Sequence, residues 1–258
     1  MIDTGDGRIK LDVVGAVATI TIARPEKLNA LDFEMILALE RAAHLIDANA
    51  TIHVAIFTGE GEKSFCAGGD IAAWSAQDPE TFGLQWVRAG HRAFDALTRL
   101  RQPLIAAVNG HILGGGFELA TCADYRIGEE HIKIGLPETG LGIIPGWSGT
   151  QRSVKRFGSQ VIRRMALFGD VYDSEQALAA GLIDQLVPKG ESMTAALKLA
   201  ETILTRSCFA TAAAKMMINA ADGEDAERAL EALGGVAAAH SAELKKGLEN
   251  FRVKKKPQ

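Results

Sequence analysis

Two glutamates stand in glycine-rich surroundings in the middle of the chain. Glu118 follows three consecutive glycines in "NGHILGGGFELA", and Glu138 stands in "LPETGLG" among glycine, proline and apolar residues. Such surroundings remove water from a carboxylate, which raises its pKa above the usual value of about 4.3. Two carboxylates sharing one water could activate it toward a polarised double bond and return a proton to the neighbouring carbon. Each glutamate taken alone is also compatible with a solvated surface charge.

Two glycine turns could supply backbone N–H donors to the same reaction. In "LGGGFELA" a strand gives way to a helix, so the N–H groups around Gly115 have no partner inside the helix. The turn "FCAGGDIAAW" repeats this logic, with Gly69 able to present its N–H and Asp70 placed to cap a helix. Two donors converging on one oxygen form an oxyanion hole, which suits a thioester carbonyl becoming an enolate. Tight packing of helix on strand is the alternative interpretation of each turn.

The elements that position these turns alternate between strands and helices. A hairpin is predicted at "IKLDVVGAVATITIA", and the apolar spacing predicts a helix over residues 32–48 followed by a buried strand over 54–58. The order strand, glycine loop and helix then repeats, with a helix predicted over 82–100, a strand at "LIAAVNG" and a helix at "FELATCAD". This order predicts an α/β fold of repeated supersecondary units.

The end of the chain has a different composition. After about Ser174 the sequence is rich in alanine and predicts helices without further strands. We therefore place a boundary near Val187, between a core of residues 1–187 that carries the site and a helical region of residues 188–258. Helices with apolar stripes beyond the needs of the core pack either on a neighbouring subunit or on their own core.

Composition excludes several classes of function. The 258 residues are 47% hydrophobic and carry a formal net charge of -4, which gives no global attraction to nucleic acid or to an anionic membrane. The N-terminus lacks a signal-peptide pattern and no apolar run has membrane-spanning length, so we expect a cytoplasmic protein. Three cysteines without metal-type spacing favour reduced thiols and no zinc site.

An ordered set of motifs resembles the enoyl-CoA hydratase/isomerase, or crotonase, superfamily. The resemblance spans nearly the whole chain and is carried by "RPEKLNAL", "FCAGGD", "NGHILGGGFELA", "LPETGLGIIPGWSGTQR", "AGLIDQLVP" and "FRVKKKP". It implies a spiral core of repeated ββα units, a C-terminal helical region that forms a homotrimer, and commonly a hexamer of two trimers. The order of the motifs is the specific signal, because each motif alone is weak.

The resemblance also implies a role for individual residues. Gly69 and Gly115 would supply the N–H groups of the oxyanion hole, while Glu118 and Glu138 would hold the water and move the proton. The CoA part of the substrate would be bound by residues of three separate motifs: Lys27, Leu28, Ala67, Gly68, Asp70, Lys254 and Lys255.

The presence of both glutamates favours a hydratase, because relatives in the superfamily that catalyse other reactions usually lack one or both. We expect addition of water to a 2-enoyl-CoA to give a 3-hydroxyacyl-CoA, or the reverse dehydration, with coenzyme A as part of the substrate and no metal or prosthetic group. The alternatives are another CoA-thioester reaction on the same fold, such as isomerisation or thioester hydrolysis, and a CoA-binding oligomer without turnover. A lysine-tail contact with RNA is disfavoured by the acidic net charge.

Three positions depart from the pattern of the superfamily. Trp147 and Ser148 stand where the family often has a small residue and a glycine, in "PGxGGTQR", and Ala72 stands where a lysine is common. We hypothesise that Trp147, together with Trp74 or Trp86, walls the acyl end of the pocket and favours short or planar acyl groups. A tryptophan of the core or of a subunit contact is the alternative.

Overall fold

The computed structural model describes residues 2–244 and 246. Its body contains two sheets, and in both of them most neighbouring strands are parallel. The six-stranded sheet has the order β1 (Ile9–Val14), β2 (Val17–Ile22), β3 (Val54–Gly59), β5 (Leu104–Val108), β7 (Tyr125–Glu129) and β10 (Gln185–Val187). The four-stranded sheet has the order β4 (Ser64–Cys66), β6 (His111–Leu113), β8 (Lys133–Gly135) and β9 (Val171–Asp173).

The chain winds as a spiral in which each turn visits both sheets. The strands β3, β5 and β7 are neighbours in the large sheet, and the strands that follow them, β4, β6 and β8, are neighbours in the small sheet in the same order. A helix or helical turn follows each pair of strands: α2 (Ile71–Trp74), α5 (Gly115–Ala120) and η3 (Glu138–Leu141). The predicted spiral of ββα units is therefore confirmed, and successive turns place their loops side by side.

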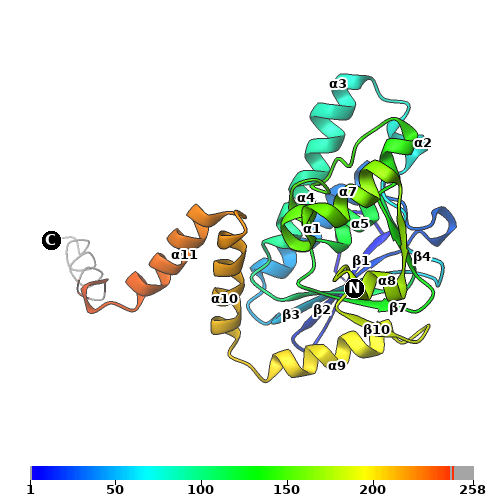
Figure 1. Cartoon of the computed structure of the whole chain (residues 1–258). Coiled ribbons are helices and arrows are strands. Elements are labelled where there is room, and N and C mark those ends of the chain that lie inside the picture. Colours follow the sequence, from blue (N-terminus) through cyan, green and yellow to red (C-terminus); the bar gives the residue numbers. More distant parts are fainter. Residues whose placement is uncertain (1, 245, 247–258) are drawn as a thin grey trace.

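Helices cover both faces of the large sheet (Figure 1). The helices α1 (Phe33–Ala48) and α4 (Arg88–Thr98) pack with the main hydrophobic core on one face, whereas α9 (Ser192–Leu204) covers the other. Every residue of β3 and of β5 is buried, as expected for parallel strands with both faces covered. The side chain of Asp32 accepts the N–H of Met35 and caps α1, which begins where the apolar spacing predicted it.

The remaining helical elements lie mainly at the surface. They are η1 (Pro25–Lys27), α3 (Pro79–Thr81), η2 (Phe82–Val87), α6 (Arg152–Phe157), α7 (Ser159–Phe168) and α8 (Ser174–Ala179). We predicted one continuous helix over residues 82–100. The structure has instead the π-helical segment η2, followed directly by α4, which ends at Thr98.

One sequence prediction about strands was wrong. Strands were expected to stop after about Ser174, yet β10 (Gln185–Val187) pairs in parallel with β7 and forms an edge of the large sheet. A strand of three residues is too short to show a two-residue period, and its partner β7 lies far away in the sequence. The prediction failed because this pairing is a tertiary contact.

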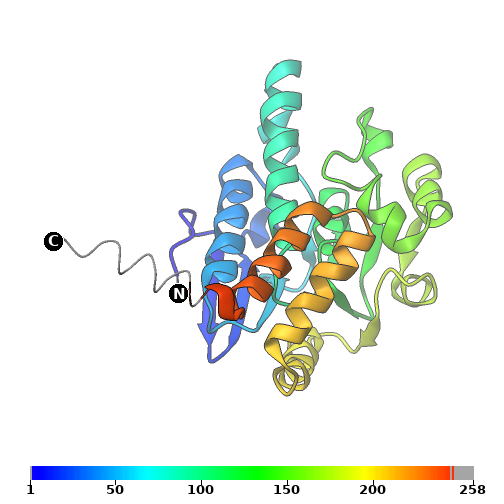
Figure 2. The ribbon, with the colours of Figure 1, turned by 90° about the vertical axis from the view of Figure 1, so that its left-hand side faces the viewer.

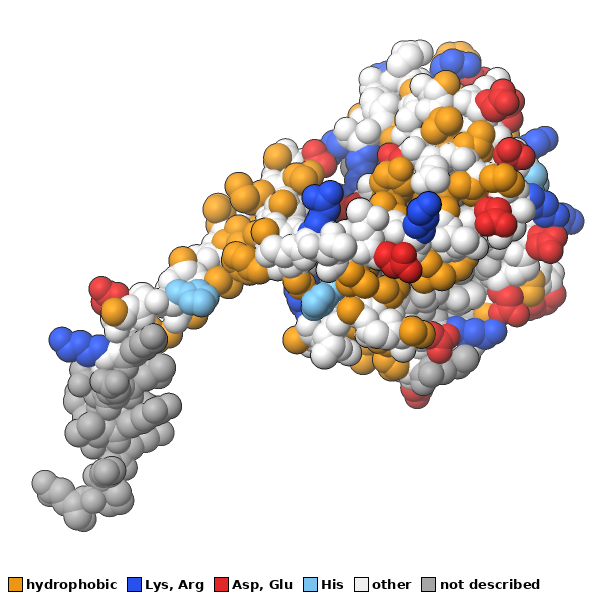
Figure 3. Space-filling model, turned by 90° about the horizontal axis from the view of Figure 1, so that it is seen from below, with side chains coloured by type: hydrophobic (Ala, Val, Ile, Leu, Met, Phe, Trp, Pro, Cys, Tyr) orange, Lys and Arg blue, Asp and Glu red, His pale blue; other side chains and the backbone are white. Residues whose placement is uncertain are grey.

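The last two helices, α10 (Cys208–Ala221) and α11 (Ala226–Ala239), form an arm after α9. The side chains of Lys215 and Asn219 on α10 bond to backbone carbonyls of the core, whereas α11 lies farther out in Figure 1. Figure 2 shows the two helices side by side in front of the core. Large apolar side chains are exposed along this arm, where Figure 3 shows several orange clusters among white and charged side chains. Among the described residues, none of the helices has both the length and the hydropathy of a membrane-spanning segment.

Candidate active site

The two glycine turns meet back to back at the start of α5. Gly68, two residues after β4, has a φ of +95°, and a Cβ placed on it would lie 2.9 Å from the backbone nitrogen of Gly115. A Cβ on Gly116 would lie 1.9 Å from the carbonyl oxygen of Cys66, so no side chain fits there. Glycine is required at these positions because two backbones approach each other closely.

The N–H groups of Gly69 and Gly115 are free to bind a ligand. Among the described residues neither N–H donates a hydrogen bond, and both glycines line one cavity of about 60 Å³. Gly115 is the first residue of α5, where the N–H points out of the helix and the helix dipole adds partial positive charge. The structure thus brings together the two donors that the sequence analysis had paired.

Glu118 is buried on α5 with its side chain directed into the same cavity. It is 2% exposed, and its Oε1 accepts the backbone N–H groups of Trp147 at 2.7 Å and of Gly149 at 2.6 Å. Burial, with a further contribution from the charge of Glu138, raises the pKa of Glu118 to about 8, although the two hydrogen bonds favour the ionised form. A Cβ on Gly149 would lie 2.7 Å from Oε1, so glycine permits this contact.

Glu138, the first residue of η3, is 7% exposed and lines the cavity as well. Neither of its carboxylate oxygens has a hydrogen-bond partner among the described residues. Burial raises the pKa of Glu138 to about 7. The carboxyl group of Glu138 can lie this close to the backbone of Gly114 only because residue 114 is glycine. A Cβ at that position would lie 2.9 Å from Oε1 of Glu138.

These two carboxyl groups can act as an acid and a base at the same pH. Since the pKa of Glu138 is raised to about 7 and that of Glu118 to about 8, the pair carries a proton near neutrality while retaining a carboxylate. A protonated and an ionised carboxyl group on one small cavity can deliver one proton and accept another. Two N–H donors on the same cavity can stabilise an oxyanion formed between those steps.

Aromatic side chains form much of the rest of the cavity, which is lined by Trp74, Phe82, Trp86 and Trp147. The Trp147 ring lies 5.8 Å from that of Trp86, and a Cβ on Gly115 would lie only 2.7 Å from it. On α4, a Cβ on Gly90 would lie 2.0 Å from Nε1 of Trp147. The indole therefore occupies the space between α4 and the start of α5, where all three tryptophans named from the sequence border the cavity.

The residues predicted to bind CoA lie beside the first glycine turn. Lys27 and Leu28 are exposed, and the carbonyl of Leu28 accepts the N–H of Ala67 at 3.1 Å. Asp70 caps α2 and pairs with Arg24 at 2.8 Å, which ties the turn to the segment before α1. The other two predicted residues, Lys254 and Lys255, lie outside the described residues. In the part of the chain that is described, no cluster of three metal-ligating side chains is found.

The contact of His91 with Ser148 and the backbone conformation of Ser148 were not expected from the sequence, although Ser148 was named as a departure from the family pattern. Nδ1 of His91 lies 3.1 Å from Oγ of Ser148, and Ser148 has a φ of +79°. No local pattern links residues 57 positions apart, although a serine replacing a glycine in a family motif was a signal. Two other histidines lie elsewhere: His44 is exposed on α1, and Nδ1 of His111 accepts the N–H of Lys133.

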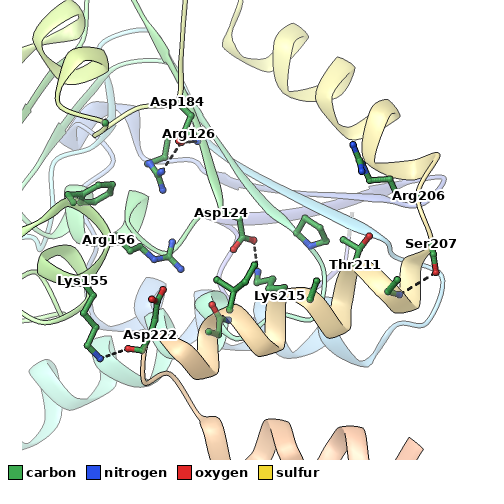
Figure 4. A pocket seen from close by; sticks show the side chains of 17 residues that line it. Asp124, Arg126, Lys155, Arg156, Asp184, Arg206, Ser207, Thr211, Lys215 and Asp222 are labelled. Atoms are coloured by element: carbon green, nitrogen blue, oxygen red, sulfur yellow. Dashed lines mark hydrogen bonds and ion pairs between the residues drawn. The ribbon is translucent and has the colours of Figure 1, made fainter. Parts of the chain in front are cut away.

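A larger cavity of about 1040 Å³ lies between α10 and the core (Figure 4). Four of its charged groups form ion pairs: Lys215 with Asp124 at 2.6 Å, and Arg126 with Asp184 at 2.7 Å. None of the described residues predicted to act in the site lines it. The chemistry of the glutamate pair therefore belongs to the smaller cavity.

The chain belongs to the enoyl-CoA hydratase/isomerase family, because residues 12–258 match the sequence model of that family. A crotonyl-CoA hydratase from Syntrophomonas wolfei is 36% identical to it over 83% of this chain and 82% of the relative. A short-chain-enoyl-CoA hydratase from Clostridium acetobutylicum is 35% identical over 81% of this chain and 80% of the relative. The family predicted from the motifs is confirmed, and with it an enzyme of the hydratase type.

Solved structures agree with this assignment. An enoyl-CoA hydratase from Bacillus anthracis superposes with a TM-score of 0.81 at 31% identity, covering 97% of this chain and 98% of the other. DspI from Pseudomonas aeruginosa superposes with a TM-score of 0.83 at 30% identity, covering 98% and 97%. The predicted fold class is therefore confirmed over almost the full length.

Proposed function

We propose that this protein adds water across the double bond of short 2-enoyl-CoA thioesters, giving 3-hydroxyacyl-CoA, and catalyses the reverse dehydration. The observation that carries the proposal is the position of Glu118 and Glu138, two buried carboxyl groups with raised pKa values that border one cavity with two free N–H donors. Membership of the family supports the CoA thioester as substrate.

The proposed reaction needs one base, one acid and one oxyanion site. The thioester oxygen binds between the N–H groups of Gly69 and Gly115, which stabilise negative charge as the carbonyl becomes an enolate. The ionised carboxyl group of the pair removes a proton from water, whose oxygen bonds to the β-carbon. The protonated carboxyl group then gives its proton to the α-carbon, which restores the carbonyl and leaves the pair with one proton.

The cavity supports a short acyl group. Its volume of about 60 Å³ is far below the roughly 300–1,000 Å³ that is typical of pockets for small molecules. Because the Trp147 indole fills the space toward Gly90, we propose that it ends the acyl path after a few carbons. The CoA part would extend past Ala67 toward Lys27 and Leu28, since Ala67 is half-buried and its carbonyl accepts no hydrogen bond among the described residues.

We further propose that the protein is a homotrimer or a hexamer of two trimers, assembled through residues 188–258. Several large apolar side chains on the arm are more than half exposed, namely Phe209, Met217, Ile218 and Leu230. An apolar surface of this kind marks a protein interface more often than free surface (Figure 3). The large sheet ends with Val187 of β10, and the arm begins after α9, which still covers one face of that sheet.

The test is to incubate the purified protein with crotonyl-CoA and with a cinnamoyl-type CoA. Loss of the absorbance of the conjugated thioester, with a product heavier by one water, is the expected result. A product of unchanged mass with a moved double bond would replace hydration by isomerisation. Release of free CoA would replace it by hydrolysis, and no product from either substrate or from a wider thioester panel would overturn the proposal.

A further inference from the structure

The segment Trp147-Ser148-Gly149 forms a small anion site around Glu118. The N–H groups of Trp147 and Gly149 both point at Oε1 of Glu118, at 2.7 and 2.6 Å. The residue between them, Ser148, has a φ of +79°. Backbone that turns through the left-handed region makes neighbouring N–H groups converge, which is how short segments bind anions. The conformation of Ser148 thus sets the direction of both donors.

Serine is an unexpected residue in this conformation. Only glycine adopts a positive φ without steric cost, because every other L-residue places its Cβ close to the backbone. Other contacts must therefore hold Ser148. Its carbonyl accepts the N–H of Arg152 at 2.9 Å, and its side chain has one partner, because Oγ of Ser148 lies 3.1 Å from Nδ1 of His91 on α4. Burial lowers the pKa of His91, so the imidazole is neutral near pH 7.

His91 is itself held by a rigid part of the core. The charged groups that face it are Asp95, on the next turn of α4, and Arg152, at the start of α6. Arg152 is buried and joins these elements, because it pairs with Asp95 at 2.6 Å and with Glu224 at 2.8 Å. The histidine therefore connects a fixed helix to the segment that binds Glu118.

We propose that His91 and Ser148 are positioning residues that clamp the Trp147-Ser148-Gly149 segment and thereby orient the carboxyl group of Glu118. The expected effect of the clamp on kcat rests on the proposed function. The geometry of the clamp does not depend on that function. Neither residue contacts the reacting atoms, so their substitution changes the orientation of Glu118 and leaves the CoA-binding residues in place.

Substitutions of Ser148 separate the clamp from the backbone conformation. Ser148→Ala removes the hydroxyl but keeps the Cβ, whereas Ser148→Gly removes the hydroxyl and the steric cost together. We expect His91→Ala and Ser148→Ala each to lower kcat about tenfold or more with little change in KM, since small displacements of a catalytic group are costly. Ser148→Gly should recover most of that loss, alone and combined with His91→Ala. His44→Ala, at an exposed histidine on α1, is the matched control.

The pH dependence of kcat provides a readout that a loss of stability alone would not move. The two N–H bonds favour the ionised form of Glu118, so weakening them raises its pKa further above about 8. Glu118 has the higher pKa of the pair, so it carries the proton at the optimum and its ionisation sets the alkaline limb of the profile. That alkaline limb should then move to higher pH in His91→Ala and Ser148→Ala. It should return toward the wild-type position in Ser148→Gly.

Amide hydrogen exchange tests the clamp without any turnover. Exchange at Trp147 and Gly149 should accelerate in His91→Ala and in Ser148→Ala relative to His44→Ala. Unchanged exchange together with an unmoved pH profile would overturn the inference, as would Ser148→Gly behaving like Ser148→Ala. If the wild-type protein does not hydrate enoyl-CoA but the exchange responds as described, the proposed function fails and the clamp stands.

Discussion

Oε1 of Glu118 accepts the backbone N–H of Trp147 at 2.7 Å, although 29 positions separate the two residues. One residue thus serves the site twice, because its backbone holds a carboxyl group while its indole closes the cavity beside Gly115. The orientation of an acid–base group and the size of the acyl pocket are therefore determined by the same loop.

Replacing either glutamate by glutamine should abolish most of the turnover. We expect Glu118→Gln and Glu138→Gln each to lower kcat by about 10²- to 10⁴-fold, because each variant removes one of the two proton-transfer groups. The wild-type profile of kcat against pH should be bell-shaped around the two raised pKa values, about 7 and about 8. Steady-state hydration of crotonyl-CoA across pH measures both effects.

The matched control is Glu130→Gln, since Glu130 is exposed on the loop after β7. It should leave kcat and the pH profile as in the wild type. Full activity in either buried variant would remove that glutamate from the mechanism.

Glu138→Gln should stabilise the fold at alkaline pH. The pKa of Glu138 is about 7 in the folded protein against an ordinary 4.5, so the folded state binds the proton more tightly than the unfolded state. Stability of the wild type therefore falls as pH rises from the ordinary pKa through the folded one, by about 3 kcal/mol in total. Glutamine carries no charge and avoids this loss.

Urea unfolding at about pH 5 and about pH 9 measures the difference between variant and wild type. The difference should grow toward alkaline pH, whereas Glu130→Gln should show none. An equal difference at both pH values would mean that burial of the charge is not its cause.

Truncating Trp147 should lengthen the acyl path. In Trp147→Ala the space between Gly90 and Gly115 opens, so the ratio of kcat/KM for an eight-carbon over a four-carbon enoyl-CoA should rise about tenfold or more. The backbone N–H that binds Glu118 is kept in this variant. Trp147→Phe retains most of the ring volume and should keep the short-chain preference. A ratio unchanged in Trp147→Ala would place the end of the acyl path elsewhere.

Charging the arm should dissociate the assembly. We expect the wild type to have a mass that is a multiple of 27.4 kDa, and Phe209→Asp or Leu230→Asp to reduce it, because a buried unpaired carboxylate is costly. Light scattering after size-exclusion chromatography measures the mass. Val14→Asp, at an exposed apolar residue that ends β1, is the control. A monomeric wild type would refute the interface.

The sequence by itself determined the family, the fold class and the list of residues to inspect. The motifs around Gly69, Gly115, Glu118 and Glu138 could be recognised because each is local: a strand ends, glycine permits a turn, and a helix begins. The cap of α1 at Asp32 was readable for the same reason. Whether these motifs act together remained an expectation, since spacing along the chain does not specify distance in space.

Only the tertiary structure decided how the carboxyl groups are held and what limits the cavity. The contacts of Glu118 with Trp147 and Gly149, and of His91 with Ser148, join segments that meet only when the turns of the spiral stack. The strand β10 escaped prediction for the same reason, because three residues become a strand only beside β7. Burial, which raises both glutamate pKa values, is likewise a property of the packed chain and not of any one segment.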